Sequence, residues 1–147
     1  MGLDNFWLKA TKWDEDTNEA IEFDKFCYGG QELPCDFLNG GLVNSGYFRG
    51  KVFTDLFDAL LEDINMSLFC GDDDMSRHDI EYCAESMQWA KNHLLEEDGE
   101  LWLESFKNEH LKDSHFVSLY TYETVMSFIM MFEWYARQDD VFLHAWF

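Results

Sequence analysis

A glycine-containing segment with two cations stands directly before a stretch with helical periodicity. Backbone N–H groups and the positive end of a helix dipole attract phosphate and carboxylate groups, and a guanidinium can bind such an anion through two hydrogen bonds. The segment therefore predicts an anion site, in a small-ligand-binding protein or in an enzyme for a phosphorylated or carboxylated metabolite. The residues expected to bind this ligand are Gly46, Arg49, Gly50 and Lys51.

The same segment has a second interpretation, in which the glycines form a turn and the two cations pair with nearby acids such as Asp55. The phosphate-loop motif does not apply. It needs a glycine where this chain has Ser45, and a serine or threonine where it has Val52.

Cysteine and histidine supply the residue types of a metal site without its spacing. The four cysteines, Cys27, Cys35, Cys70 and Cys83, form no Cys-x-x-Cys pair. Cys83 falls on the apolar side of a predicted helix and is expected in the core. We therefore assign no metal ligand and expect no cofactor.

One local cluster has the residue types of a nucleophilic site, namely His110, Asp113, Ser114 and His115. It lacks the strand–turn–helix setting that exposes a nucleophile, and neighbours in sequence do not make a triad. No catalytic residue is assigned, and the sequence favours a protein that is not an enzyme.

Acidic residues are the extreme feature of the composition. The chain of 147 residues has 30 acidic and 10 basic side chains and a formal net charge of −20 at pH 7. Such a field repels nucleic acid and anionic lipid and attracts basic surfaces, including the phosphate-binding grooves of nucleic-acid enzymes. We expect a basic, nucleic-acid-binding protein as the partner, and no direct contact with nucleic acid or membrane.

Two predicted helices carry carboxylates along one side, in steps of three or four residues. Such steps climb ~4.5–6 Å, the same order as the spacing of charges on nucleic acid. Residues 51–100 contain 14 acidic and 3 basic residues, a local charge of −11, with few of the lysines that usually offset a solvated helix face. The residues expected to contact the partner are Asp55, Asp58, Glu62, Asp72, Asp73, Asp74, Glu81, Glu85, Glu96, Glu97 and Asp98.

These features favour an acidic protein–protein interaction module that mimics nucleic acid, for example a phage-type inhibitor of a host nuclease or defence complex. Three alternatives stay open. The anion site described above predicts a ligand-binding protein or enzyme, a plain acidic domain could dock through an apolar patch, and the charge could simply keep a ring-rich protein in solution.

The secondary structure that would position these residues follows from hydrophobic patterning. Ring-rich stretches at 6–13 and 21–28, separated by a polar break, predict a β-hairpin. Apolar residues at three- and four-residue steps predict helices at about 51–65, from about 76 until Gly99, and at about 121–137, the last buried nearly all round. A short apolar stretch at 141–147 predicts a strand beside the hairpin. The expected fold is α+β, a small and mainly antiparallel sheet with about three helices.

The chain is expected to form a single domain over residues 1–147, because its length suits one core and no linker divides it. Its N-terminus has neither the basic start and apolar run of a secretion signal nor a myristoylation pattern. With the cysteine usage, this predicts a reduced, cytoplasmic location.

Two short stretches resemble known sequences. Met1 to Trp7 (MGLDNFW) and Ser45 to Phe53 (SGYFRGKVF) are similar to small uncharacterised proteins of bacteria and their viruses, which begin in the same way and carry a Phe-Arg-Gly-Lys segment. The resemblance implies no activity. It implies that 44–53 forms a defined structural or functional element.

Overall fold

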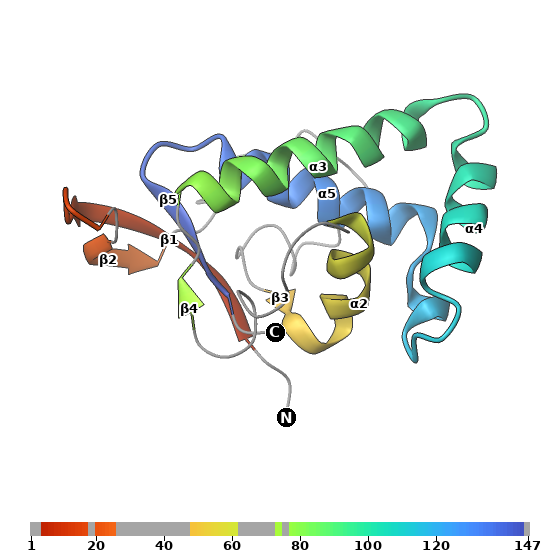
Figure 1. Cartoon of the computed structure of the whole chain (residues 1–147), viewed down its shortest axis with the longest axis horizontal. Coiled ribbons are helices and arrows are strands. Elements are labelled where there is room, and N and C mark those ends of the chain that lie inside the picture. The colour runs from red at the N-terminus through yellow and green to blue at the C-terminus, as the bar shows by residue number, and fades with distance from the viewer. Residues whose placement is uncertain (1–3, 18–19, 26–47, 62–72, 75–76, 146–147) are drawn as a thin grey trace.

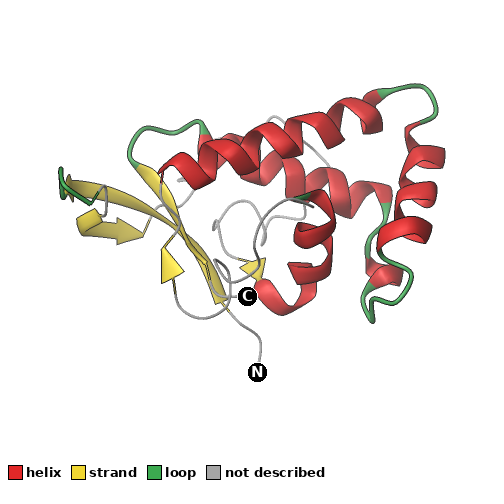
Figure 2. Cartoon of the chain, viewed as in Figure 1, coloured by secondary structure: helices red, strands yellow, loops and turns green. Residues whose placement is uncertain are grey.

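A computed structural model describes residues 4–17, 20–25, 48–61, 73–74 and 77–145 of the chain. Strands gather at one end of this part of the molecule and helices at the other, as Figure 2 shows. The fold is α+β, as the sequence predicts.

The sheet is built around the N-terminal strand β1 (Asp4–Trp13). β1 pairs with β2 (Ala20–Lys25) to form the predicted hairpin, and its other edge pairs with the C-terminal strand β5 (Val141–Ala145). Two short strands complete the sheet: β3 (Phe48–Arg49) pairs with the start of β1, and β4 (Asp73–Asp74) pairs with β5. Every one of these described pairings is antiparallel, which confirms the predicted sheet.

The turn that precedes β5 is anchored to β1. Asp140 has a φ of 60°, a left-handed conformation that aspartate tolerates better than most residues. Its carbonyl oxygen accepts a hydrogen bond from the Ala10 amide at 2.8 Å, and its carboxylate accepts one from the Trp13 indole N–H at 3.0 Å. This one residue therefore ties the entry of β5 to the end of β1.

The described part of the chain contains four α-helices, one more than predicted. These are α2 (Gly50–Leu60), α3 (Arg77–Leu95), α4 (Gly99–His110) and α5 (Tyr122–Ala136). Three of them correspond to the predicted helices, whereas α4 was not predicted. Figure 1 shows α3 packed along α5, α2 between the sheet and α4, and α4 at the end farthest from the hairpin.

The core lies between α5 and the elements around it. Phe128, Ile129, Phe132 and Tyr135 of α5 are fully buried, as expected for a helix covered nearly all round. The Trp7 ring of β1 stacks on Tyr135 at 5.1 Å and meets Phe132 edge-on at 5.0 Å, which joins the sheet to α5. Contacts between large rings therefore join the sheet to the helices.

α3 contacts the rest of the molecule through a buried apolar side and through an ion pair with α5. Its apolar side is buried and includes Cys83, which confirms the prediction that this cysteine lies in the core. From the same helix Lys91 reaches the buried Glu133 of α5, with 2.8 Å between its ammonium nitrogen and Oε2. Glu133 also pairs with Arg137. These two cations offset part of the free-energy cost of burying the charge of Glu133.

The junction between α3 and α4 is very tight. Gly99, the first residue of α4, is buried, and a Cβ placed on it would lie 2.1 Å from the carbonyl oxygen of Leu94. A side chain therefore has no room at this position. The close approach sets how α4 leaves the end of α3, and thus where α4 lies relative to α2.

Candidate binding groove

The predicted anion segment is only partly within the described residues. Gly46 lies outside them. Arg49 belongs to β3, and Gly50 and Lys51 begin α2, but the side chains of Arg49 and Lys51 are not among those described. The anion site therefore stays a prediction.

The predicted partner-binding carboxylates fall into three groups. Glu81 and Glu85 on α3 and Glu96, Glu97 and Asp98 in the turn after α3 are all exposed. Asp55 and Asp58 are partly buried on the side of α2 that faces α4 and the turn after it. The remaining residues are Glu62 and Asp72, outside the described part, and Asp73 and Asp74, whose backbone forms β4.

Asp55 and Asp58 line a cavity of about 370 Å³ that Ala59, His110, Asp113 and Ser114 complete. The Ser114 hydroxyl donates a hydrogen bond to Asp55 Oδ2 at 2.6 Å, and accepts one from the Phe116 amide at 3.1 Å. The turn after α4 is thereby fixed against α2. Three carboxylates, from Asp55, Asp58 and Asp113, consequently face one small space.

Asp58 is the least compensated of these carboxylates. Its Oδ1 atom is buried and makes no hydrogen bond with any described residue. Burial, and secondly the neighbouring charge of Asp55, raise the pKa of the Asp58 carboxyl from 3.8 to about 6. Both causes act against the ionised form, so an incoming group with positive charge and N–H donors would stabilise it.

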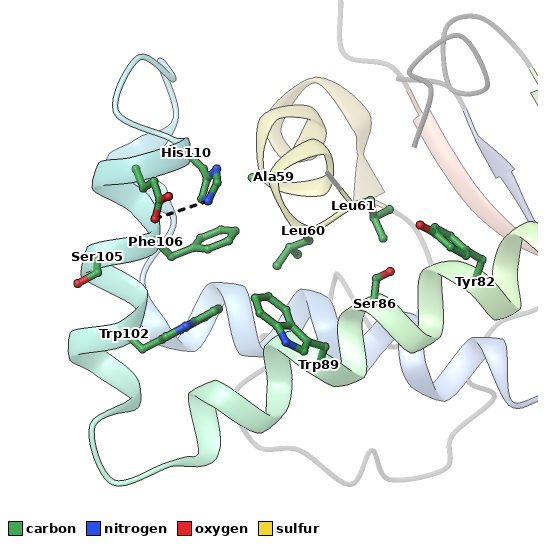
Figure 3. A pocket seen from close by; sticks show the side chains of 11 residues that line it. Ala59, Leu60, Leu61, Tyr82, Ser86, Trp89, Trp102, Ser105, Phe106 and His110 are labelled. Carbon is green, nitrogen blue, oxygen red and sulfur yellow. Dashed lines mark ion pairs between the residues drawn. The ribbon is translucent and has the colours of Figure 1, made fainter. Parts of the chain in front are cut away.

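A second cavity, of about 460 Å³, lies between α2, α3 and α4 and is lined mainly by aromatic side chains. Figure 3 shows Tyr82 and Trp89 entering from α3, Trp102 and Phe106 from α4, and Leu60 from α2. Ser86, Ser105, Glu109 and His110 add polar atoms. Both its volume and its mixture of rings with a few polar groups are typical of ligand sites.

The rings of this cavity contact one another. Trp102 stacks on Phe106 at 5.1 Å and on His93 at 5.0 Å, and Trp89 meets Trp102 edge-on at 5.9 Å. Trp89 nevertheless has 53% of its surface exposed. Part of its surface is therefore available to another molecule.

The two cavities adjoin, because Ala59 and His110 line both of them. We call the combined feature the α2–α4 groove. One part is aromatic, around Trp89 and Trp102, and the other is acidic, around Asp58 and Asp113. Glu109, which pairs with His110 at 3.8 Å, lines the aromatic part.

The sequence carries a signal for this groove that the prediction did not use. Tyr82, Ser86, Trp89 and His93 recur along α3 at helical spacing, and each follows by one position a member of the polar line Glu81, Glu85, Gln88 and Asn92. One residue corresponds to about 100° around a helix, so the aromatic line borders the acidic line. Aromatic residues that lie between the buried side of a helix and an acidic line indicate a binding surface.

Among the residues that the structure describes, the remaining candidates form no catalytic or metal arrangement. Ser114 contacts Asp55, and no described hydrogen bond joins it to His110 or His115. Among the described residues no group of three or more histidine, cysteine or carboxylate side chains is placed to hold a metal ion.

None of the described helices is both long enough and apolar enough to cross a membrane. In comparisons with protein-family models, with curated proteins and with solved structures, no match to this chain was found.

Proposed function

We propose that this protein is a non-enzymatic interaction module that binds a basic, nucleic-acid-binding protein. Its carboxylates would occupy the positions at which that partner binds the phosphates of nucleic acid. The observation that carries the proposal is the exposure of Glu81, Glu85, Glu96, Glu97 and Asp98 along α3 and the turn after it. Inhibition of a nucleic-acid enzyme in the cytoplasm, as by a phage-type inhibitor, is the specific form of this proposal.

The spacing of these carboxylates supports a phosphate-like arrangement. Glu81 and Glu85 are four residues apart on α3, which separates them by about 6 Å along the helix axis. Charges on nucleic acid recur every few ångströms along each strand. The carboxylates of α3 therefore have a spacing comparable to that of the successive phosphates that a partner binds through lysine and arginine.

Exposed apolar side chains beside these carboxylates favour a protein partner over a purely solubilising role. Leu95 is 62% exposed, Leu101 71% and Trp89 53%, all on α3 and α4. Apolar and aromatic contacts at the centre with charged groups around them are typical of protein interfaces. Salt would weaken the charged contacts and leave the apolar ones.

Charge reversal at matched places tests the proposal. In one variant Glu81, Glu85 and Glu97 are each changed to Lys, and in the control Glu15, Asp16 and Glu22 of the hairpin are changed to Lys. Both sets are exposed and alter the net charge equally. The readout is capture of proteins from a lysate at about 0.15 M and about 0.5 M salt, with identification by mass spectrometry.

The expected result is capture of a basic, nucleic-acid-binding protein that is lost at high salt and with the α3 variant but kept with the hairpin variant. Purified, this partner should also lose nucleic-acid binding when the wild-type protein is added. Capture that both variants retain, or no such partner at either salt concentration, would overturn the proposal.

A further inference from the structure

We infer that the α2–α4 groove binds an arginine side chain of the basic partner. The inference rests on the proposed function and adds the recognition element: one residue type of the partner and the side chains that receive it. It is carried by the aromatic and acidic parts of the groove meeting at Ala59 and His110.

The aromatic part suits a guanidinium. A cation over the face of an aromatic ring is attracted to it, tryptophan is the strongest such ring, and arginine is the side chain most often found there. Trp89 retains exposed surface, and Trp102, Tyr82 and Phe106 surround the same space. The apolar stem of an arginine side chain would also replace water against these rings.

The acidic part supplies acceptors that an arginine can satisfy. The carboxylates of Asp55, Asp58 and Asp113 line its space. A guanidinium carries five N–H donors in a planar fork and can pair with a carboxylate through two of them. A lysine ammonium is a more compact and more strongly hydrated charge, and it does not stack on rings in this way.

Charge complementarity excludes the other common occupants of aromatic grooves. A phosphorylated or carboxylated ligand would face Asp55, Asp58, Asp113 and Glu109, in a chain of net charge −20. A neutral sugar or nucleobase would stack on the rings but leave the acidic part without a counter-charge. An arginine serves both parts with one side chain.

The probe for the test is a tetra-arginine peptide, titrated into the whole protein by calorimetry at about 0.15 M salt. The matched peptide is tetra-citrulline, in which a neutral urea group replaces each guanidinium at the same length. Tetra-arginine should bind, tetra-citrulline should show no measurable heat, and tetra-lysine should bind at least threefold more weakly. Equal binding of citrulline or lysine would overturn the inference.

Variants of the groove locate the binding. Trp89→Ala should weaken tetra-arginine binding about tenfold, consistent with loss of a partly desolvated cation–π contact. Asp58→Asn should weaken it about fivefold. Trp89→Phe, which retains a ring, should lose less than threefold, and Phe23→Ala, which removes an exposed ring of the hairpin, should leave binding unchanged. Unchanged affinity in Trp89→Ala would place the peptide elsewhere.

Failure of this inference can be told apart from failure of the proposed function. If the Glu81, Glu85 and Glu97 reversals abolish partner capture but Trp89→Ala does not, the groove is not the recognition element and the proposed function stands. If tetra-arginine binds through Trp89 but no basic protein is captured, the groove is a cation site and the proposed function fails. Circular dichroism of each variant confirms that the fold is retained.

Discussion

Two sets of aromatic rings in this molecule have the same chemistry and opposite surroundings. In the core, Trp7, Phe132 and Tyr135 are fully buried, and Trp7 of the sheet contacts both rings of α5. In the α2–α4 groove, Trp89 and Trp102 also contact one another, but Trp89 is more than half exposed. The core rings are covered by the chain itself, whereas the ring of Trp89 is covered only in part.

The difference separates stability from binding. Burial of a large ring contributes to the free energy of folding in proportion to the area removed from water, and an exposed ring contributes far less. Exposed rings beside carboxylates are therefore explained better by a partner than by the fold. Substitutions in the two regions should accordingly differ most in their effect on stability.

The sharpest comparison pairs Phe132→Ala with Trp89→Ala. Phe132 is fully buried against Trp7 and Phe57, so its truncation should lower the free energy of unfolding by about 3–5 kcal/mol. Trp89→Ala should lower it by less than about 1 kcal/mol, because half of the ring is already in water. Urea denaturation measures both. Equal losses would show that the groove rings belong to the core and would remove the basis of the comparison.

A smaller effect is expected where the groove depends on backbone geometry. Gly99→Ala should lower the free energy of unfolding by about 2 kcal/mol, because its Cβ would meet the Leu94 carbonyl oxygen at 2.1 Å and the backbone must shift. The shift should move α4 and weaken tetra-arginine binding as well. The control is Asp98→Ser, a substitution at the neighbouring exposed position. Wild-type stability in Gly99→Ala would mean that the α3–α4 junction is not rigid.

The smallest effect concerns the acidic part of the groove and depends on pH. Because the pKa of Asp58 is raised from 3.8 to about 6, the folded protein binds more protons than the unfolded chain between these pH values, so Asp58 destabilises the fold as pH rises through them. Asp58→Asn should raise the free energy of unfolding at pH 7 by about 1 kcal/mol, a value reduced for screening because solvent reaches the carboxyl.

The same variant should gain no stability at pH 3.5, where the Asp58 carboxyl is protonated in the folded protein. Thermal denaturation of wild type and Asp58→Asn at several pH values between 3.5 and 7.5 measures the difference. Glu97→Gln, at an exposed site, is the control. A difference between Asp58→Asn and wild type that does not change with pH would show that ionisation of Asp58 is not its cause.

Much of the fold could be predicted from the sequence, because its signals are local. Two ring-rich stretches separated by a polar break predict the hairpin, and apolar spacing predicts α2, α3 and α5. The strand β5 was predicted to pair with the hairpin, and it does. These elements bury one side, or in α5 nearly every side, so their periodicity is clear.

α4 could not be predicted in the same way. Gly99 was expected to end the second predicted helix, but α3 ends at Leu95 and Gly99 is the first residue of α4. A residue interpreted as a helix stop is therefore a helix start. Leu101 is exposed and Trp102 only partly buried, whereas Leu103 and Phe106 are buried. The apolar residues of α4 therefore do not form one narrow stripe.

The missing helix also explains why the groove was not predicted. Asp55 and Asp58 stand on the side of α2 opposite its apolar residues, and the sequence alone gives no reason to place another helix against that side. In the structure α4 and the turn after it contribute His110, Asp113 and Ser114 there. Contacts between residues about fifty positions apart depend on the packing of helices, which periodicity does not encode.

The inward direction of Lys91 has a consequence for the protein in solution. Between Ile80 and Leu95 it is the only lysine or arginine, and its ammonium is directed to Glu133 of α5. The charge of Lys91 therefore offsets a buried carboxylate and not the exposed carboxylate of Glu85. Mobile cations from the buffer should accumulate over this surface, and a basic partner would displace them. The entropy gained by those released ions would then contribute to the free energy of association.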